Sequence, residues 1–215
     1  MGEAEGSGTA GTRNGRVVGW SLLLPPGWWH VPVDERRNRS LSALLDRVLS
    51  SLPRDRIALW RHELTAQLTG FVEQAAERGA SDVYLLADLR RGLPLAASCL
   101  ATILPFAPPD DAPAIALAHA LADRDGDEPG VLTVGDRTCA RIRRREPGTG
   151  LPEPGTATAE DYARALPTTR LEVYLPFPDG GRMLLLSFST SVEPVADAMV
   201  TLFEAMAESL RWRWE

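Results

Sequence analysis

The stretch that decides the fold is TRLEVYLPFPDGGRMLLLSFSTSVEPVADAMVTLFEAMAESLRWRW, which runs from Thr169 to Trp214. Apolar and polar residues alternate over 171–175, and this period of two predicts a half-buried strand. Residues 179–181 read Asp-Gly-Gly and supply the flexible backbone of a tight turn. The run 183–188 is almost entirely apolar, so we expect a central strand that is covered on both faces.

The same stretch ends in an amphipathic helix. Pro194 suits the first turn of a helix, because proline has no N–H to donate there. Apolar residues then recur at helical spacing, and together they form one face. They are Val195, Met199, Leu202, Phe203, Met206 and Leu210.

Upstream of this unit, the same periodicities predict further helices and hairpins. The predicted strands are 17–24, 82–89, 96–104, 131–134 and 137–145, and the predicted helices are 40–52, with Ser40 as N-cap, and 54–78. Residues 114–122 fit either a helix or a strand. Successive hairpins imply an α+β fold, a mostly antiparallel sheet packed by helices in an α/β/α sandwich. We expect residues 1–15 to be a disordered tail and 16–215 to form a single domain.

Composition narrows the class of protein. The chain has 215 residues, 44% of them hydrophobic, and its formal net charge is −6. All 23 basic residues are arginine, which points to a GC-rich coding sequence of the actinobacterial kind. An acidic chain is a poor candidate for binding nucleic acid or anionic membranes. The N-terminus lacks the basic and apolar segments of a secretory signal, so we expect a cytoplasmic protein with no membrane partner.

No residue pattern indicates catalysis, a cofactor or a metal site. Cys99 and Cys139 have no CxxC spacing, and we expect two buried thiols. The acidic run 123–128 lacks the glycine and glutamate that a calcium loop requires at its sixth and twelfth positions, so a solvated turn is favoured. The histidines do not have metal-ligand spacing. A nucleophilic pair such as Cys99 with His30 could be formed only by the fold.

Two groups of residues are candidates for binding a partner. Arg141, Arg143 and Arg145 would share one face of a strand, which suits either a solvated, charge-protected edge or a docking site for an acidic protein or an anionic ligand. Trp28, Trp29 and Trp214 would pack in the core or at the sheet edge by default. As exposed side chains they would instead anchor an interface. No aromatic platform is interleaved with the arginines, so nucleic acid is disfavoured.

The closing unit resembles a known superfamily. Its alternating strand, glycine turn, apolar strand ending in Ser-Phe-Ser-Thr and final helix are similar to the PsbP-like α/β/α sandwiches, which include the actinobacterial LpqN-like lipoproteins and a Ran-binding nuclear import factor. The similarity covers roughly the last fifth of the chain. The chain departs from the LpqN-like pattern because it has no lipidation cysteine behind a signal peptide. The resemblance implies a non-enzymatic domain that binds other proteins, and it transfers no catalytic residue.

Three functions remain open from the sequence. The first is a cytoplasmic protein-binding or adaptor module, which would contact its partner through the arginine strand or the tryptophans. The second is a small-ligand-binding or enzymatic domain with its site under the Gly/Pro-rich loop 146–160. The third is a structural homo-oligomer subunit that uses an exposed edge strand or the tryptophans.

Overall fold

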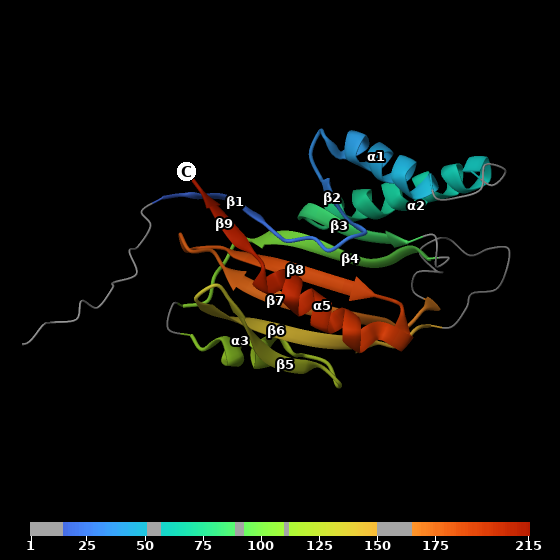
Figure 1. The fold of residues 1–215 in the computed structure, drawn as a ribbon. Helices are drawn as coiled ribbons and strands as arrows, with labels where there is room; N and C mark the ends of the chain where they lie inside the picture. The colour runs from blue at the N-terminus through green and yellow to red at the C-terminus, as the bar shows by residue number, and fades with distance from the viewer. Residues whose placement is uncertain (1–14, 51–56, 89–92, 110–111, 150–164) are drawn as a thin grey trace, which may run out of the picture.

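The computed structural model describes residues 15–50, 57–88, 93–109, 112–149 and 165–215. Its main feature is a seven-stranded sheet in the order β2-β3-β4-β8-β7-β6-β5, with every neighbouring pair antiparallel (Figure 1). The strands are β2 (Trp28–Pro32), β3 (Ala80–Asp88), β4 (Leu93–Leu104), β5 (Glu128–Val134), β6 (Arg137–Glu146), β7 (Thr168–Pro176) and β8 (Met183–Thr190). The predicted α+β fold with an antiparallel sheet is confirmed.

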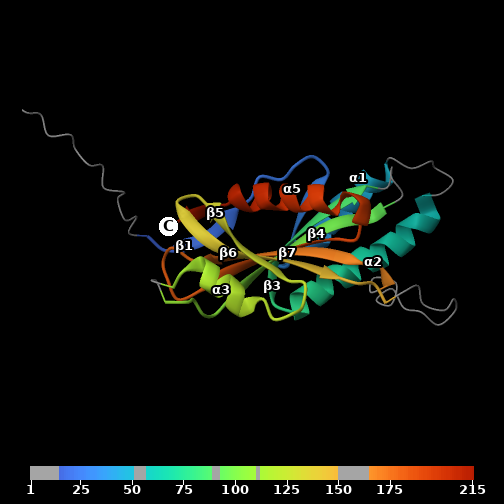
Figure 2. The ribbon, with the colours of Figure 1, turned by 90° about the horizontal axis from the view of Figure 1, so that it is seen from below.

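Helices cover both faces of the sheet. On one face lie α1 (Arg37–Leu49) and α2 (Ile57–Glu77), over β2 to β4, and α3 (Ala114–Leu121), over β5 and β6. On the other face lies α5 (Ala196–Glu208), which follows a short 3-10 turn (Glu193–Val195). Seen from below, α5 and the pair α2 and α3 lie on opposite sides of the sheet (Figure 2). The domain is therefore a three-layer sandwich.

The central core lies between α5 and the sheet. Phe188 of β8 and Phe203 of α5 are both fully buried, and their rings stack with centroids 5.0 Å apart. Trp28 of β2 meets Phe203 edge-on at 6.1 Å. The alternation predicted over 171–175 is confirmed, because Leu171, Val173 and Leu175 all point into this core. The predicted closing strands and helix therefore form the centre of the fold.

Two ends of the chain form a structure that the sequence did not predict. β1 (Val17–Ser21) pairs antiparallel with β9 (Arg211–Trp214), and this two-stranded ribbon is separate from the main sheet. The segment Trp28–Pro32, which follows β1 in the chain, forms the edge strand β2 of the main sheet. Periodicity could not find β9, because four residues are too few to show a pattern. Its pairing depends on contacts made between the two ends of the chain.

Other local predictions are corrected or completed. Ser40 was predicted as an N-cap, but the first helix begins at Arg37 and the Ser40 N–H donates to the Arg36 carbonyl, so this prediction is wrong. Residues 114–121 are helical, which settles the open choice for that segment. The predicted tail up to residue 14 and the predicted loop from 150 to 160 lie outside the described residues.

The strand β8 is covered fully on one face only. Its burial alternates, and Leu185, Ser187 and Ser189 are half-buried on the face that carries α2 and α3. The two helices cover opposite edges of that face, so the strip between them stays partly open. The Ser98 and Ser189 hydroxyls, 2.8 Å apart, hydrogen-bond to each other there. The strand is thus central with helices on both faces, as predicted, but its cover is complete only on the α5 face.

Gly148 is the described glycine at which an added side chain would meet backbone atoms most closely. A Cβ placed on it would lie 2.2 Å from the Ala165 carbonyl oxygen and 2.8 Å from the Leu166 carbonyl carbon. We expect Gly148→Ala to destabilise the domain by about 1–3 kcal/mol, because backbone atoms must shift. Gly70→Ala, in α2 with no neighbour within 4 Å, is the matched control and should stabilise by about 0.5–1 kcal/mol. Urea unfolding monitored by circular dichroism measures both, and equal effects would contradict the close contact.

Candidate functional site

The arginines of β6 lie against α5. Strand alternation points Arg141, Arg143 and Arg145 to the face that this helix covers. Arg141 Nε is 3.2 Å from Glu204 Oε1, and Arg145 Nη2 is 3.2 Å from Asp197 Oδ1. The predicted common face is therefore present, but its charges already have partners on the neighbouring helix.

Arg143 is the most buried of these three side chains. It forms an ion pair with Asp197, and its Nη1 lies 3.8 Å from Glu128 Oε2 on the edge strand. Its hydrogen bond and charge hold the pKa of Asp197 below the ordinary value. Arg145 shares Asp197 and is 61% exposed, so of the three predicted arginines it is the most accessible to a partner.

Arg144 is a functional candidate that the sequence reasoning missed. It points to the opposite face, beside α3, and is only 7% exposed. Its Nε donates to Glu172 at 3.2 Å, and its Nη2 donates to the Leu121 carbonyl at 2.9 Å. Its Nη1 donates to Asp123 at 3.0 Å and to Asp127 at 2.5 Å. The signal in the sequence was an arginine on the same strand face as Ile142, where a buried charge must be paired.

The acidic run 123–128 therefore has a structural role. The side chain of Asp127 is only 4% exposed, so the prediction of a solvated turn is wrong at this residue. The hydrogen bond from Arg144 holds the pKa of Asp123 below its ordinary value. Burial lowers the pKa of Arg144, but the bonds to Asp123 and Glu172 outweigh it and leave that pKa raised. The cluster ties the end of α3 and the following loop to the sheet.

The tryptophans are distributed over different environments. Trp28 is 7% exposed and packs in the core, and its indole Nε1 has no hydrogen-bond partner among the described atoms. Trp29 points to the opposite face and packs beside α1 and α2. Trp214 is half-buried in the ribbon. They do not form one exposed patch, and their roles in partner binding stay predictions.

The sheet register explains why Cys99 and His30 do not form a nucleophilic pair. Tyr84 lies opposite His30 on one side and opposite Cys99 on the other. The His30 ring stacks on Tyr84 at 4.9 Å, and its Nε2 lies 2.5 Å from Asp82 Oδ1. Burial raises the pKa of the Cys99 thiol, which is the opposite of what a thiolate nucleophile requires.

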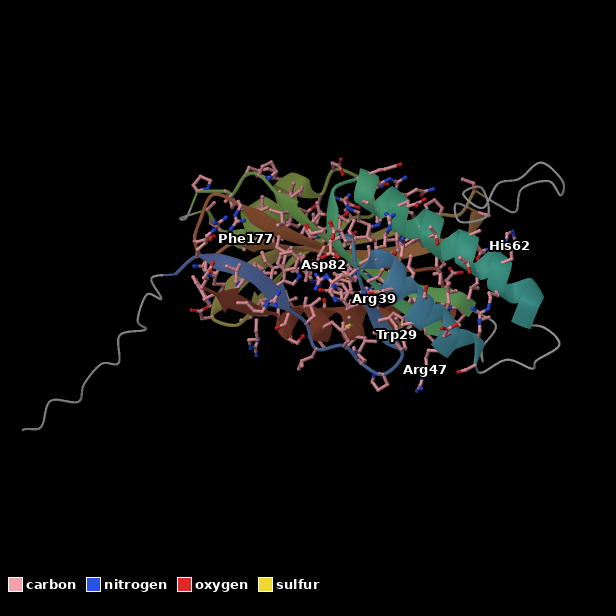
Figure 3. All side chains as sticks on the ribbon, turned by 90° about the horizontal axis from the view of Figure 1, so that it is seen from above. Trp29, Arg39, Arg47, His62, Asp82 and Phe177 are labelled. Atoms are coloured by element: carbon pink, nitrogen blue, oxygen red, sulfur yellow. The ribbon has the colours of Figure 1, made fainter. Side chains whose placement is uncertain are left out.

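Burial likewise raises the pKa of the Cys139 thiol, to about 11. Both cysteines are free and buried, as predicted. The other histidines lie elsewhere, with His62 on α2 well away from Asp82 (Figure 3). Within the described part of the chain, no three His, Cys, Asp or Glu side chains gather as a metal site would require.

A recess lies beside the ribbon, at the end of the sheet where Phe177 is found (Figure 3). Its volume is about 340 Å³. The lining residues are Arg16, Val17, Val18, Gly19, Trp20, Ile103, Phe177 and Arg182. They come from three separate parts of the chain, which is why no sequence motif indicated the recess. Both charged side chains of the lining are arginines.

The recess has a rigid floor. Trp20 meets Phe177 edge-on at 6.5 Å, and Trp212 of β9 packs on the same ring at 4.7 Å. The Arg182 guanidinium lies 4.1 Å from the centre of the Phe177 ring and is held by Asp179 at 3.1 Å. Asp179 also accepts the Val17 N–H at 3.1 Å, which fixes β1 in place. Apolar side chains and the two arginines thus line the recess together.

Comparisons with known proteins give only a distant likeness. No known protein family and no curated protein matches the chain. A crystal structure of a protein from Bacteroides thetaiotaomicron VPI-5482, at 1.50 Å resolution, is similar with 11% identity and a TM-score of 0.38. The match covers 61% of this chain and 38% of that one, so the chain spans well under half of that protein. No helix in the described ranges is long and apolar enough to cross a bilayer.

The Arg144 cluster predicts a pH-dependent stability. At neutral pH, Arg144→Met should cost about 3–5 kcal/mol, because it leaves Asp127 and Glu172 without their cation. The lowered pKa of Asp123 means that its contribution is present above the ordinary value of 3.8 and is lost as the pH falls through the lower folded-state value. The difference in free energy of unfolding between wild type and Arg144→Met should therefore become smaller at acid pH.

Arg145→Met is the matched control, because the same change at an exposed position should cost no more than about 0.5 kcal/mol. Urea unfolding of all three proteins across the acid range measures the free energies. A difference between wild type and Arg144→Met that does not change with pH would contradict this role of the ion pairs.

Proposed function

We propose that this domain is a non-enzymatic protein-binding module and that the recess beside β1 is its contact site. The observation that carries the proposal is that exposed apolar side chains and two arginines line one hollow. Val18 is 51% exposed and Ile103 is 36% exposed, although both are apolar. Exposed apolar side chains that surround a hollow are typical of a protein contact surface.

The charges of the recess favour one kind of partner. Among the described residues, no carboxylate lies within ion-pair distance of Arg16, whereas Arg141, Arg143 and Arg145 all have acidic neighbours. An incoming carboxylate would therefore meet an unpaired cation at the recess and would have to compete with Asp197 or Glu204 at β6. We infer a partner segment that presents an apolar side chain next to an acidic one.

The resemblance to PsbP-like domains and the expected cytoplasmic location are both compatible with this proposal. The resemblance to PsbP-like domains implies the binding of other proteins, and it agrees with a contact site built from an apolar hollow. The cytoplasmic location also stays a proposal. A ligand site under the loop 146–160 is the alternative, and most of that loop lies outside the described residues.

The test is site-specific photo-crosslinking in cells of the native host. A benzophenone amino acid replaces Val18 at the recess, or Val195 as the control. Val195 is similarly exposed and lies just before α5, at the end of the molecule away from the ribbon (Figure 1). We expect crosslinks to a specific protein from position 18 and none to that protein from position 195. Equal labelling at both positions would contradict the assignment.

The crosslinked partner then allows a quantitative comparison. The double variant Arg16→Glu, Val18→Asp should weaken its binding at least about tenfold, which corresponds to about 1.4 kcal/mol. Val195→Asp should leave binding unchanged. Arg143→Glu with Arg145→Glu tests the strand that the sequence favoured. Isothermal titration measures all four proteins, and a loss confined to the β6 variant would move the site from the recess to the arginine strand.

A further inference from the structure

The strand β5 is an edge of the sheet. It is the last strand in the sheet order, and among the described residues β6 is its only pairing partner. Seen from below, β5 lies between α3 and α5, which pack on opposite faces of the sheet (Figure 2). An unpaired edge presents a row of backbone N–H and C=O groups to any strand that approaches it.

The turn that follows β5 shows which backbone groups point outward. Gly135 has φ +65°, whereas Asp136, like every described residue other than glycine, does not have a positive φ. The two-residue turn Gly135-Asp136 therefore fits type II′. In such a hairpin the flanking pair, Val134 and Arg137, exchanges both of its hydrogen bonds. Alternation then directs the N–H and C=O of Val131 and Thr133 away from β6. Pro129, nearer the start of the strand, has no N–H.

The side chains at this edge do not protect it. Val131 is 45% exposed, and Thr133 beside it is also exposed. Ile115 of α3, the helix that packs on β5 and β6, is 42% exposed. Natural edges are usually shielded by lysine, proline or a bulge, and the chain has no lysine. Between Gly130 and Val134 none of these devices is present.

We propose that β5 pairs antiparallel with the β5 of a second copy of this chain and joins the two sheets across a two-fold axis. The edge is complementary to itself. The outward backbone N–H and C=O of Val131 in each copy meet the C=O and N–H of Thr133 in the other copy. Both residues are β-branched, and such side chains pack well as cross-strand pairs. A two-fold contact of this kind closes on itself and forms a dimer.

The charges near the edge are compatible with this partner. Antiparallel pairing brings the Gly135-Asp136 turn of one copy beside the start of β5 in the other. Arg137, which is exposed and has no ion pair within the described ranges, then comes within reach of Glu128 of the second copy. The Glu128 side chain is 52% exposed, with its nearest cation 3.8 Å away. The attraction between Arg137 and Glu128 also offsets the repulsion between Glu128 and Asp136, which are both negatively charged.

The dimer contact is independent of the proposed function. The recess lies beside the β1–β9 ribbon and takes its sheet residues from β4 and from the turn between β7 and β8, whereas β5 is the last strand at the lower edge of the sheet (Figure 1). A second copy at β5 therefore leaves the recess open. Failure of the dimer would leave the proposed partner site unaffected, and failure of the partner site would leave the dimer unaffected.

The test is sedimentation equilibrium of the full chain over a range of concentrations. Wild type should sediment as a dimer, and Val131→Lys or Thr133→Lys should each shift it to monomer, because a lysine on an edge strand disfavours pairing with another strand. Val18→Lys, the same substitution at another exposed valine, should stay dimeric. Circular dichroism melting confirms that each variant folds. A monomeric wild type, or a dimer that persists in both β5 variants, would overturn the proposal.

Disulfide trapping locates the contact separately. Cys99 and Cys139 are buried, so a cysteine placed at Val131 or Thr133 supplies the reactive thiol. Opposed residues in an antiparallel pair are close enough for a disulfide. A mixture of Val131→Cys and Thr133→Cys proteins should crosslink on mild oxidation, and Val18→Cys should not. A wild-type dimer with no crosslink from either β5 position, alone or mixed, would place the interface elsewhere.

Discussion

The fold depends on the contact between the central strand and the closing helix. Phe188 and Phe203 stack in the fully buried layer between the sheet and α5, and Trp28 of the edge strand packs on the same aromatic group. Aromatic pairs of this kind contribute about 0.5–1.5 kcal/mol beyond the area that they bury. Because Phe203 contacts residues from both β8 and β2, this one helix holds distant strands of the sheet in place.

Along one row of paired residues that crosses the sheet, the side chains change from polar at the edges to apolar at the core. The paired positions His30, Tyr84, Cys99, Phe188, Leu171, Arg143 and Glu128 cross all seven strands on the α5 face. The row is apolar in the middle and polar at both ends, where water can reach. The arginines of β6 stand at the boundary, and they are long enough to reach acids on α5 and β5. Ion pairs there attach the helix to the margin of the sheet.

Ion pairs within the fold decide whether a run of arginines in the sequence is available to a partner. Arg141, Arg143 and Arg145 read as a surface for an acidic partner, but the fold supplies acids on α5 that pair with all three. Arg144, which the pleat of the strand sends to the other face, pairs with Asp123 and Asp127. The charge is largely neutralised within the molecule. Arg16 and Arg182, which no motif singled out, border the apolar recess. A candidate site therefore arises where residues far apart in the chain meet at the end of the sheet.

The sequence by itself determined the antiparallel sheet, the two central strands, the closing helix and the burial of both cysteines. Each follows from local periodicity or turn chemistry, which acts between residues close in the chain. Only the tertiary structure decided the ribbon of β1 with β9, the half-open face of β8, the ion pairs of Arg143 and Arg144, and the recess. Each of these depends on which distant segments lie side by side, and periodicity carries no information about long-range pairing. The stretch from Thr169 to Trp214 thus specified its own strands and helix but not the distant segments that they contact.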